Sequence, residues 1–300
     1  MRKGPPTPTI DVLDSTMHYE DLGAARARSG GVPFVFLHGN PTSSHLWRGV
    51  LPRIEAGVRV LAPDLIGMGR SGKPGGEYRF EDHARYLDAW FDALGLDEVV
   101  LVGQDWGGAL AFDRAARHPG RVRGIAFMET IVRPLSWAQY PPAARARFEA
   151  IRTPGVGEEM VLDRNVFIED SVRQTVLNPM GEADHAVYAA PYPTRESRLP
   201  MLRWARSLPI DGDPADVHAV VEKYDAWLAD SPDVPKLLLT FDGSPALMVG
   251  PETVAWCEEN VSALETEYCG PAAHLCPEDR PEEIAAAVNS WAARHGLAAG

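Results

Sequence analysis

The chain has 300 residues, with 29 Lys and Arg against 42 Asp and Glu, and a formal net charge of −13. This acidic balance excludes a nucleic-acid binder, whose surface must neutralise phosphates, and argues against docking on acidic lipids. With 45% hydrophobic and 24% charged residues, the composition is that of an ordinary globular protein, and the chain is long enough to bury a core without disulfides.

Short apolar runs, typical of buried parallel strands, alternate with helical patterns before residue 133. The strands are predicted at 33–37, 58–62, 99–102 and 122–128. Apolar residues at helical spacing predict helices at 80–94 and 110–118, each followed by a glycine or proline that stops the helix.

The character of the sequence changes between residues 133 and 213, where aromatic, proline and charged residues mix without a strand pattern. Helices are predicted there at 143–151, 158–161 and 184–190. The later elements are a helix at 215–228, strands at 235–240 and 261–268, and a helix at 281–295. We therefore predict a doubly wound α/β sheet, with a core domain of 1–132 and 214–300 and a helical cap at 133–213.

The cysteines and the N-terminus bear on the compartment. Cys257, Cys269 and Cys276 are odd in number and form no Cys-x-x-Cys pair, so neither a disulfide framework nor a zinc site is expected. No apolar run approaches the about 20 residues of a membrane-spanning helix, and no signal-peptide run follows the basic N-terminus. We expect a cytoplasmic protein without a membrane partner, and a mobile, Pro-rich tail at 1–9.

The strongest local signal is the segment GQDWGG at 103–108, which follows a predicted strand and precedes a helix. This is the setting of the nucleophile elbow G-x-S-x-G, with Asp105 in place of the serine. A carboxylate is ionised near neutral pH, so Asp105 can attack a carbon atom directly and form an ester. Taken alone, the segment also fits a glycine-rich turn with Asp105 as a helix cap.

Hydrolysis of such an ester needs a general base, which the chain order of this fold places late in the sequence. His274 follows the last predicted strand in a loop of small residues and is our candidate. The acid that orients it is either Glu129 or Asp242, each at the end of a predicted strand. Residue chemistry alone leaves this choice open. His38 is expected to brace the next loop rather than to carry protons.

Together, HGNP at 38–41, GQDWGG at 103–108, FME at 127–129 and His274 followed by PED at 277–279 resemble the haloalkane dehalogenases. The similarity runs from about residue 33 to 291. It implies the α/β-hydrolase fold with the cap inserted after the sixth strand, and it favours Glu129 as the acid. It also implies SN2 displacement of halide by Asp105 and ester hydrolysis by water that His274 activates, with no metal or other cofactor.

The resemblance further implies a halide pocket made by Asn40 and Trp106, whose neutral N–H donors can stabilise a growing halide charge. The backbone N–H groups of the same two residues are expected to form the oxyanion hole. The expected substrate is a small apolar haloalkane, and a halide ion is a product. We assign the apolar lining of the pocket to Phe148, Phe167, Tyr192, Leu247 and Met248.

The chain departs from the family pattern near the base and in the cap. The departures are Ala272, where glycine is usual, Leu275, Asp242, and in the cap Tyr140, Ala143, Tyr192 and Arg195. We expect these departures to change the tunnel and pocket that receive the substrate more than the catalytic residues.

Four other functions compete with this prediction. An epoxide hydrolase of the same fold also uses an Asp nucleophile and needs two cap tyrosines, for which Tyr140, Tyr188 and Tyr192 are available, but Asn40 breaks its usual HGFP loop. A haloacid-type dehalogenase needs cations beside the nucleophile, where Gln104 and Trp106 stand. A coelenterazine-type luciferase, an oxygenase, is not distinguished by these motifs. A non-enzymatic binding protein is expected to lose Asp105 or His274, and both are present.

Overall fold

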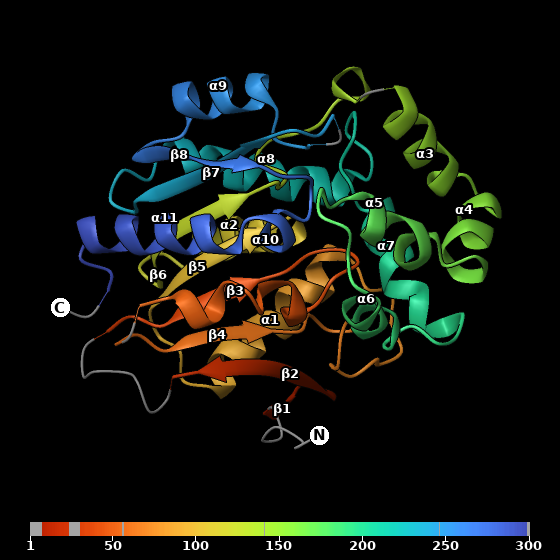
Figure 1. The fold of residues 1–300 in the computed structure, drawn as a ribbon, viewed down its shortest axis with the longest axis horizontal. Coiled ribbons are helices and arrows are strands. Elements are labelled where there is room, and N and C mark those ends of the chain that lie inside the picture. The colour runs from red at the N-terminus through yellow and green to blue at the C-terminus, as the bar shows by residue number, and fades with distance from the viewer. Residues whose placement is uncertain (1–7, 24–30, 56, 141, 246, 299–300) are drawn as a thin grey trace.

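The structure is a computed structural model that describes residues 8–23, 31–55, 57–140, 142–245 and 247–298. Residues 1–7 of the expected N-terminal tail lie outside this part of the chain. One eight-stranded sheet crosses the molecule in the order β1-β2-β4-β3-β5-β6-β7-β8 (Figure 1). β2 is antiparallel to both β1 and β4, and all other neighbours are parallel, so the predicted mostly parallel sheet is confirmed.

The strands of this sheet are bounded as follows. They are β1 (Thr9–Val12), β2 (Ser15–Leu22), β3 (Phe34–Leu37), β4 (Val60–Pro63), β5 (Val99–Gln104), β6 (Val122–Met128), β7 (Lys236–Asp242) and β8 (Leu264–Pro271).

Helices and short helical turns connect the strands. The helices are α1 (Phe80–Ala93), α2 (Trp106–Arg117), α3 (Pro142–Arg152), α4 (Val156–Glu158), α5 (Val172–Gln174), α6 (Glu182–Ala189), α7 (Leu199–Arg206), α8 (Ala215–Ala229), α9 (Pro251–Asn260), α10 (Cys276–Asp279) and α11 (Pro281–Arg294). The turns are η1 (Ser44–Trp47), η2 (Leu51–Arg53), η3 (Trp137–Gln139), η4 (Glu159–Asp163), η5 (Phe167–Ser171) and η6 (Glu196–Arg198).

Two hydrophobic cores lie on opposite faces of the sheet. Along β3, Val35 and Leu37 belong to the core under α1, α2 and α8, while Phe34 and Phe36 belong to the core under η1 and α11. Successive strand residues point to opposite faces, so a strand covered on both sides must be apolar throughout. This explains why the central strands read as unbroken apolar runs.

Some elements had no counterpart in the sequence prediction. Among them are the hairpin β1–β2 and the helices α5, α7, α9 and α10. In the hairpin, apolar and charged residues are mixed because β2 is only partly buried. α2 begins at Trp106, four residues before the predicted start, because Gly107 and Gly108 are helical rather than part of a loop. β8 begins at Leu264, three residues later than predicted.

The chain leaves the sheet after β6 and returns to it through α8. The segment between them consists of helices and short turns from η3 to α7, drawn in green and teal at one end of the sheet in Figure 1. Leu135 and Ile210 form an isolated bridge where this segment begins and ends. The insertion after the sixth strand therefore agrees with the resemblance, whereas the domain boundaries at residues 133 and 213 stay a prediction.

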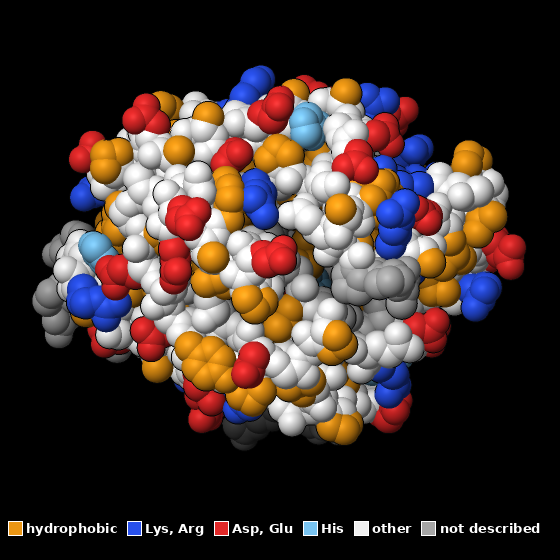
Figure 2. Space-filling view, turned by 90° about the horizontal axis from the view of Figure 1, so that it is seen from above, with side chains coloured by type: hydrophobic (Ala, Val, Ile, Leu, Met, Phe, Trp, Pro, Cys, Tyr) orange, Lys and Arg blue, Asp and Glu red, His pale blue; other side chains and the backbone are white. Residues whose placement is uncertain are grey.

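Acidic and basic side chains are interspersed on the face seen from above in Figure 2, without a patch of one sign. In the described part of the chain, no helix combines the length and apolar character that crossing a membrane requires.

Candidate active site

Asp105 stands at a sharp turn between β5 and α2, with a φ of +53° that residues other than glycine rarely adopt. The Thr130 hydroxyl donates to the Asp105 carbonyl at 2.6 Å, and the Asp105 N–H donates to the Glu129 carbonyl at 3.1 Å. A Cβ on Gly107 would lie 2.0 Å from the Leu37 carbonyl oxygen, so the turn requires glycine there. The strand–turn–helix arrangement predicted from GQDWGG is present.

His274 lies between two carboxylates. Its Nε2 is 3.5 Å from Asp105 Oδ2, and its Nδ1 is 3.1 Å from Glu129 Oε2. Burial disfavours the imidazolium, but the hydrogen bonds and charges of Asp105 and Glu129 outweigh it and raise the pKa of His274 to about 10. The structure thus brings the three predicted catalytic side chains together in one row.

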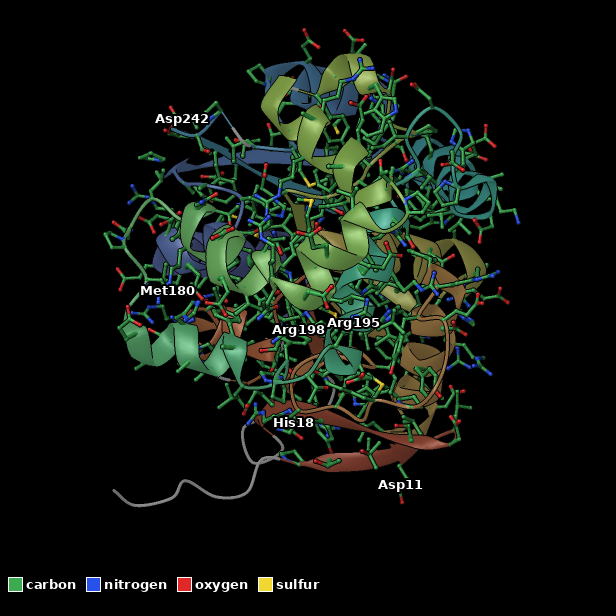
Figure 3. The ribbon with its side chains drawn as sticks, turned by 90° about the vertical axis from the view of Figure 1, so that its right-hand side faces the viewer. Asp11, His18, Met180, Arg195, Arg198 and Asp242 are labelled. Atoms are coloured by element: carbon green, nitrogen blue, oxygen red, sulfur yellow. The ribbon has the colours of Figure 1, made fainter. Side chains whose placement is uncertain are left out.

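The two candidates for the orienting acid have different surroundings. Glu129 is 1% exposed, and its two oxygens accept hydrogen bonds from the backbone N–H groups of Met248 at 2.8 Å and Val249 at 3.0 Å. Asp242 is exposed near the edge of the molecule (Figure 3), and its Oδ1 accepts the Tyr268 hydroxyl at 2.8 Å. Glu129, and not Asp242, contacts His274.

Gln104 is a neighbour of the base to which the sequence analysis assigned no role. It is fully buried, and its Nε2 lies 2.9 Å from the His274 carbonyl oxygen and 3.3 Å from His274 Nε2. The only sequence signal was its place directly before Asp105 at the carboxyl end of β5. The donors of Met248 and Val249 were also missed, because a backbone N–H carries no residue signature.

Asn40 reaches Asp105 through its backbone. The Asn40 N–H donates to Asp105 Oδ1 at 2.8 Å, as expected of an oxyanion hole. A Cβ on Gly39 would lie 2.1 Å from the same oxygen, so glycine leaves room for this contact. The Asn40 side-chain amide donates to the Met201 carbonyl at 3.3 Å, which leaves its second N–H for an anion. The contribution of the Trp106 backbone N–H stays a prediction.

Trp106 is held by a column of stacked rings. Its ring lies 4.5 Å from that of Trp204 in α7, and Trp204 lies 4.1 Å from the ring of buried His83, with interplanar angles of 27° and 26°. No hydrogen bond joins the Trp106 indole N–H to another described residue, which leaves it available to donate to an anion. The cap therefore orients one of the two predicted halide donors.

The five residues predicted to line the pocket pack against different parts of the molecule. Phe148 packs edge-on against Tyr140, with ring centres 5.8 Å apart, and Phe167 is 7% exposed. Leu247 and Met248 are partly buried beside the two hydrophobic cores. Tyr192 is buried with its hydroxyl 3.5 Å from the Pro41 carbonyl and its ring under Lys73. A lining role for all five stays a prediction.

The cap tyrosines bear on the epoxide hydrolase alternative, which needs two of them. The Tyr188 hydroxyl donates to Glu278, and the Tyr192 hydroxyl faces the Pro41 carbonyl. Of the three, only the Tyr140 hydroxyl makes no hydrogen bond among the described residues. Burial raises the pKa of Tyr140; the Arg152 charge opposes this shift and the Asp105 charge adds to it. A single available tyrosine weakens that alternative.

The other predicted residues have structural surroundings. His38 is fully buried, donates from Nδ1 to the Gly39 carbonyl at 2.9 Å and accepts the Leu65 N–H at Nε2 at 2.9 Å, so its bracing role is confirmed. Ala272 and Leu275 are buried on either side of the base. Arg195 pairs with Asp163 on the cap surface (Figure 3). Of the Ala143 side chain nothing is described.

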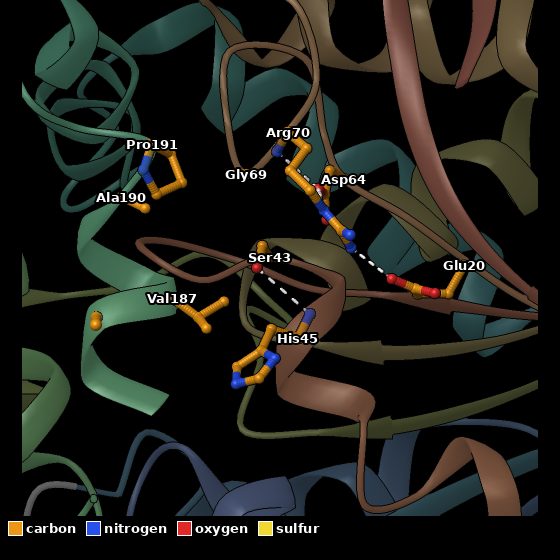
Figure 4. A pocket seen from close by; sticks show the side chains of 10 residues that line it. Glu20, Ser43, His45, Asp64, Gly69, Arg70, Val187, Ala190 and Pro191 are labelled. Atoms are coloured by element: carbon orange, nitrogen blue, oxygen red, sulfur yellow. Dashed lines mark hydrogen bonds and ion pairs between the residues drawn. The ribbon is translucent and has the colours of Figure 1, made fainter. Parts of the chain in front are cut away.

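A cavity of about 680 Å³ lies away from Asp105, between the α6 region of the cap and the loops after β3 and β4 (Figure 4). Its charged groups are already paired, because Arg70 contacts both Glu20 and Asp64. Among the described residues, no cluster of His, Cys, Asp and Glu side chains is arranged to hold a metal ion. The chemistry available at the Asp105 site is nucleophilic attack by a carboxylate, followed by base-assisted hydrolysis.

Known proteins are similar to this chain in sequence and in fold. A family described as "alpha/beta hydrolase fold" matches residues 32–235. A haloalkane dehalogenase of Mesorhizobium japonicum is 47% identical over 285 residues, 94% of this chain and 89% of that protein. One of Bradyrhizobium diazoefficiens is 43% identical, over 94% of this chain and 92% of its own.

Solved structures agree with these relatives. A haloalkane dehalogenase from Bradyrhizobium elkani superposes with a TM-score of 0.91 at 45% identity, covering 96% of this chain and 98% of that one. A structure described as an ancestral haloalkane dehalogenase gives 0.91 at 46% identity, covering 97% of this chain and all of that one. These names favour the dehalogenase reading over the epoxide hydrolase and the luciferase.

Proposed function

Because the chain belongs to the haloalkane dehalogenases, hydrolases of the α/β-hydrolase fold that act on carbon–halide bonds, we propose that Asp105 is the nucleophile, His274 the base and Glu129 its orienting acid. The observation that carries the proposal is the row Asp105–His274–Glu129, with gaps of 3.5 Å and 3.1 Å. The enzyme hydrolyses a haloalkane to an alcohol, a halide ion and a proton.

In the first half-reaction, a carboxylate oxygen of Asp105 attacks the carbon that bears the halogen. Oδ1 is already bound by the Asn40 N–H, so Oδ2 is the attacking atom. As the new C–O bond forms, the carbon–halogen bond breaks and its electron pair leaves with the halide. The side-chain N–H groups of Trp106 and Asn40 stabilise the growing charge, and as neutral donors they release the halide more easily than Arg would.

In the second half-reaction, water cleaves the alkyl ester on Asp105. His274 removes a proton from the water, and the oxygen attacks the ester carbonyl carbon. Negative charge collects on Oδ1, where the Asn40 N–H receives it. The intermediate collapses, the alcohol leaves with a proton, and the Asp105 carboxylate is restored. Glu129 holds the proton on His274 Nδ1, so that Nε2 faces the water.

Esterification itself activates the base. In the free enzyme His274 lies between two carboxylates, which hold its pKa at about 10 and keep it protonated at neutral pH. The ester carries no charge, so forming it removes the contribution of Asp105, the pKa of His274 falls, and the imidazole loses its proton to solvent. His274 then becomes a base at the step that needs one.

Bromide release tests the activity. The purified protein is incubated with 1-bromobutane and 1,2-dibromoethane, and we expect bromide and the matching alcohol in equal amounts. His274→Phe is expected to release one equivalent of bromide and to gain the mass of the alkyl group. His295→Phe, an exposed histidine paired with Glu265, is the matched control and should turn over normally. A panel of bromoalkanes that yields no bromide would contradict the activity, and an unmodified His274→Phe would contradict the role of the base.

The remaining parts of the proposal concern substrate and location. We propose small, uncharged, apolar haloalkanes as substrates, because the net charge of −13 disfavours acids. We propose a reducing, cytoplasmic compartment because Cys257, Cys269 and Cys276 are all buried free thiols. We also propose the division into a core at 1–132 and 214–300 and a cap at 133–213, which limited proteolysis at both junctions would test.

A further inference from the structure

The loop that carries His274 is hydrogen-bonded on both sides of the base, to α10 on one side and to the cap on the other. Before the base, the Ala273 N–H donates to Asp279 Oδ2 at 3.0 Å. After the base, the Leu275 N–H donates to the carbonyl of Thr175 in the cap at 2.9 Å. The two residues that flank His274 are therefore both held by groups outside their own loop.

Asp279, the last residue of α10, links this loop to the same stretch of the cap. Its carboxylate accepts the Leu177 N–H, at 3.0 Å from each oxygen, and the Asn178 N–H, at 2.9 Å from Oδ1. Together with the Ala273 N–H, three backbone donors from two segments distant in sequence meet on one side chain. The cap segment 175–178 and the base loop thus share a single acceptor.

Asp279 has no cationic partner. It is 7% exposed, and no Lys, Arg or His side chain pairs with it in the part of the chain that the structure describes. A buried carboxylate is costly unless its oxygens are satisfied, so the three N–H groups must stay in place for the charge to be tolerated. The same requirement fixes the position of Ala273 relative to Leu177 and Asn178.

We propose that Asp279 is a positioning residue that ties the His274 loop to the cap segment 175–178 and thereby sets the rate of ester hydrolysis. The proposal rests on the role of His274 as the base. It goes beyond the triad because Asp279 touches neither substrate nor His274 side chain and acts through Ala273.

The two half-reactions depend on Asp279 differently. Alkylation uses Asp105, Asn40 and Trp106, which belong to the segments after β3 and β5 and make no hydrogen bond to Asp279. Hydrolysis requires His274 Nε2 at the correct place for water, and a displacement of about 1 Å can cost about 100-fold in rate. A change at Asp279 should therefore slow the second step and leave the first unchanged.

Asp279→Asn tests this with little change in volume. An amide has one acceptor oxygen, so it can serve the cap donors or Ala273, but not both. In rapid-quench measurements with 1-bromobutane, we expect one equivalent of bromide released at the wild-type rate. Ester hydrolysis should then be about 10- to 100-fold slower, and the alkyl-enzyme should dominate the intact-protein mass at steady state.

Asp184→Asn is the matched control. Asp184 lies on α6 and also links cap and core, because it forms a hydrogen bond with His45 at 2.9 Å and an ion pair with Arg48 at 3.1 Å. In the described part of the chain, no hydrogen bond or ion pair joins Asp184 to the base loop. We expect both half-reactions of this variant to stay within about twofold of wild type, as for other surface ion pairs.

An unchanged rate of ester hydrolysis in Asp279→Asn overturns the proposal. An equal decrease in the rates of alkylation and hydrolysis overturns it too, because a general destabilisation of the fold would slow both steps. If Asp279→Asn does not fold, Asp279→Glu, which keeps two acceptor oxygens, replaces it with the same two rates and the same criteria. His274→Phe separates this inference from the proposed function. If it traps no ester, the base assignment fails; if it does but Asp279→Asn accumulates none, only the role of Asp279 fails.

Discussion

The strand tips of the core and the helices of the cap place their side chains by different means. At the tips, Asp105 and Glu129 have φ angles of +53° and +46°, and the neighbouring turns leave no room for a Cβ at Gly39 or Gly107. In the cap, rings pack on rings, as in Tyr140 against Phe148, between short helical turns. Backbone geometry thus fixes the positions of Asp105 and Glu129, whereas side-chain packing holds the aromatic residues of the cap.

The largest effect should follow from the nucleophile. Asp105→Asn removes the attacking oxygen, and bromide release from 1-bromobutane should fall more than about 10⁴-fold, as when other hydrolases lose their nucleophile. Asp242→Asn, at the exposed tip of β7, is the control and should retain full activity. A comparable loss of bromide release in the two variants would contradict the assignment of the nucleophile to Asp105 at the elbow.

The second-largest effect is expected from Glu129→Gln. A Gln side chain cannot accept hydrogen bonds from Met248, Val249 and His274 together, so the imidazole loses its orientation. Ester hydrolysis should slow by about 10²- to 10⁴-fold while alkylation persists. Rapid-quench measurement of the alkyl-enzyme checks this, and a normal hydrolysis rate would remove Glu129 from the catalytic set.

The halide donors should show a smaller effect, which also tests how far the cap contributes. Trp106→Phe keeps the stack on Trp204 but loses the indole N–H, and we expect alkylation to slow by about 10²-fold. Trp204→Phe keeps both donors and should cost less than tenfold. Stopped-flow bromide release measures both variants. A larger decrease in Trp204→Phe than in Trp106→Phe would mean that ring stacking contributes more to alkylation than the indole N–H does.

The pH dependence of stability tests the raised pKa of His274. Its folded value of about 10 lies above the unfolded value of about 6.5. The stability it contributes is therefore complete below about pH 6.5 and is lost as the pH rises through about 10. The melting temperature of wild type, relative to His274→Phe, should fall between about pH 6.5 and about 10. A constant difference would contradict a protonated His274 in the free enzyme.

The smallest effect on catalysis is expected from a substitution in the cap. Tyr140→Phe keeps the ring against Phe148 and removes only the hydroxyl. We expect kcat for 1-bromobutane to stay within about twofold and KM to change less than about tenfold, or about 1.4 kcal/mol, because the hydroxyl makes no hydrogen bond among the described residues that the change would break. Michaelis–Menten kinetics with bromoalkanes of increasing length check this. A large loss of kcat would place the Tyr140 hydroxyl in the chemistry.

Those parts of the molecule that depend on short sequence motifs or on apolar runs could be predicted from the sequence. The elbow follows from glycines around Asp105, and the base follows from the chain order that ends in His274. The apolar runs of β3 and β5 are readable because both faces of the sheet are covered. Glu129 could be chosen over Asp242 only through the family resemblance, since both end a strand.

Other parts could not be predicted because no residue pattern encodes them. The N–H groups that hold Glu129 come from the backbone of Met248 and Val249, and any residue could supply them. The role of Gln104 depends on the rotamer that turns its amide toward His274. The hairpin β1–β2 was missed because a partly buried edge lacks the unbroken apolar run of the central strands.

The most direct measurement is a single turnover in water enriched in ¹⁸O, with enzyme in excess over 1-bromobutane. If Asp105 attacks the substrate, the oxygen of the first alcohol formed comes from Asp105 and is ¹⁶O. The ¹⁸O then appears in the Asp105 carboxylate, where peptide mass spectrometry locates it. An alcohol that carries ¹⁸O in the first turnover, with Asp105 unlabelled, would show that water displaces the halide directly and would contradict the account.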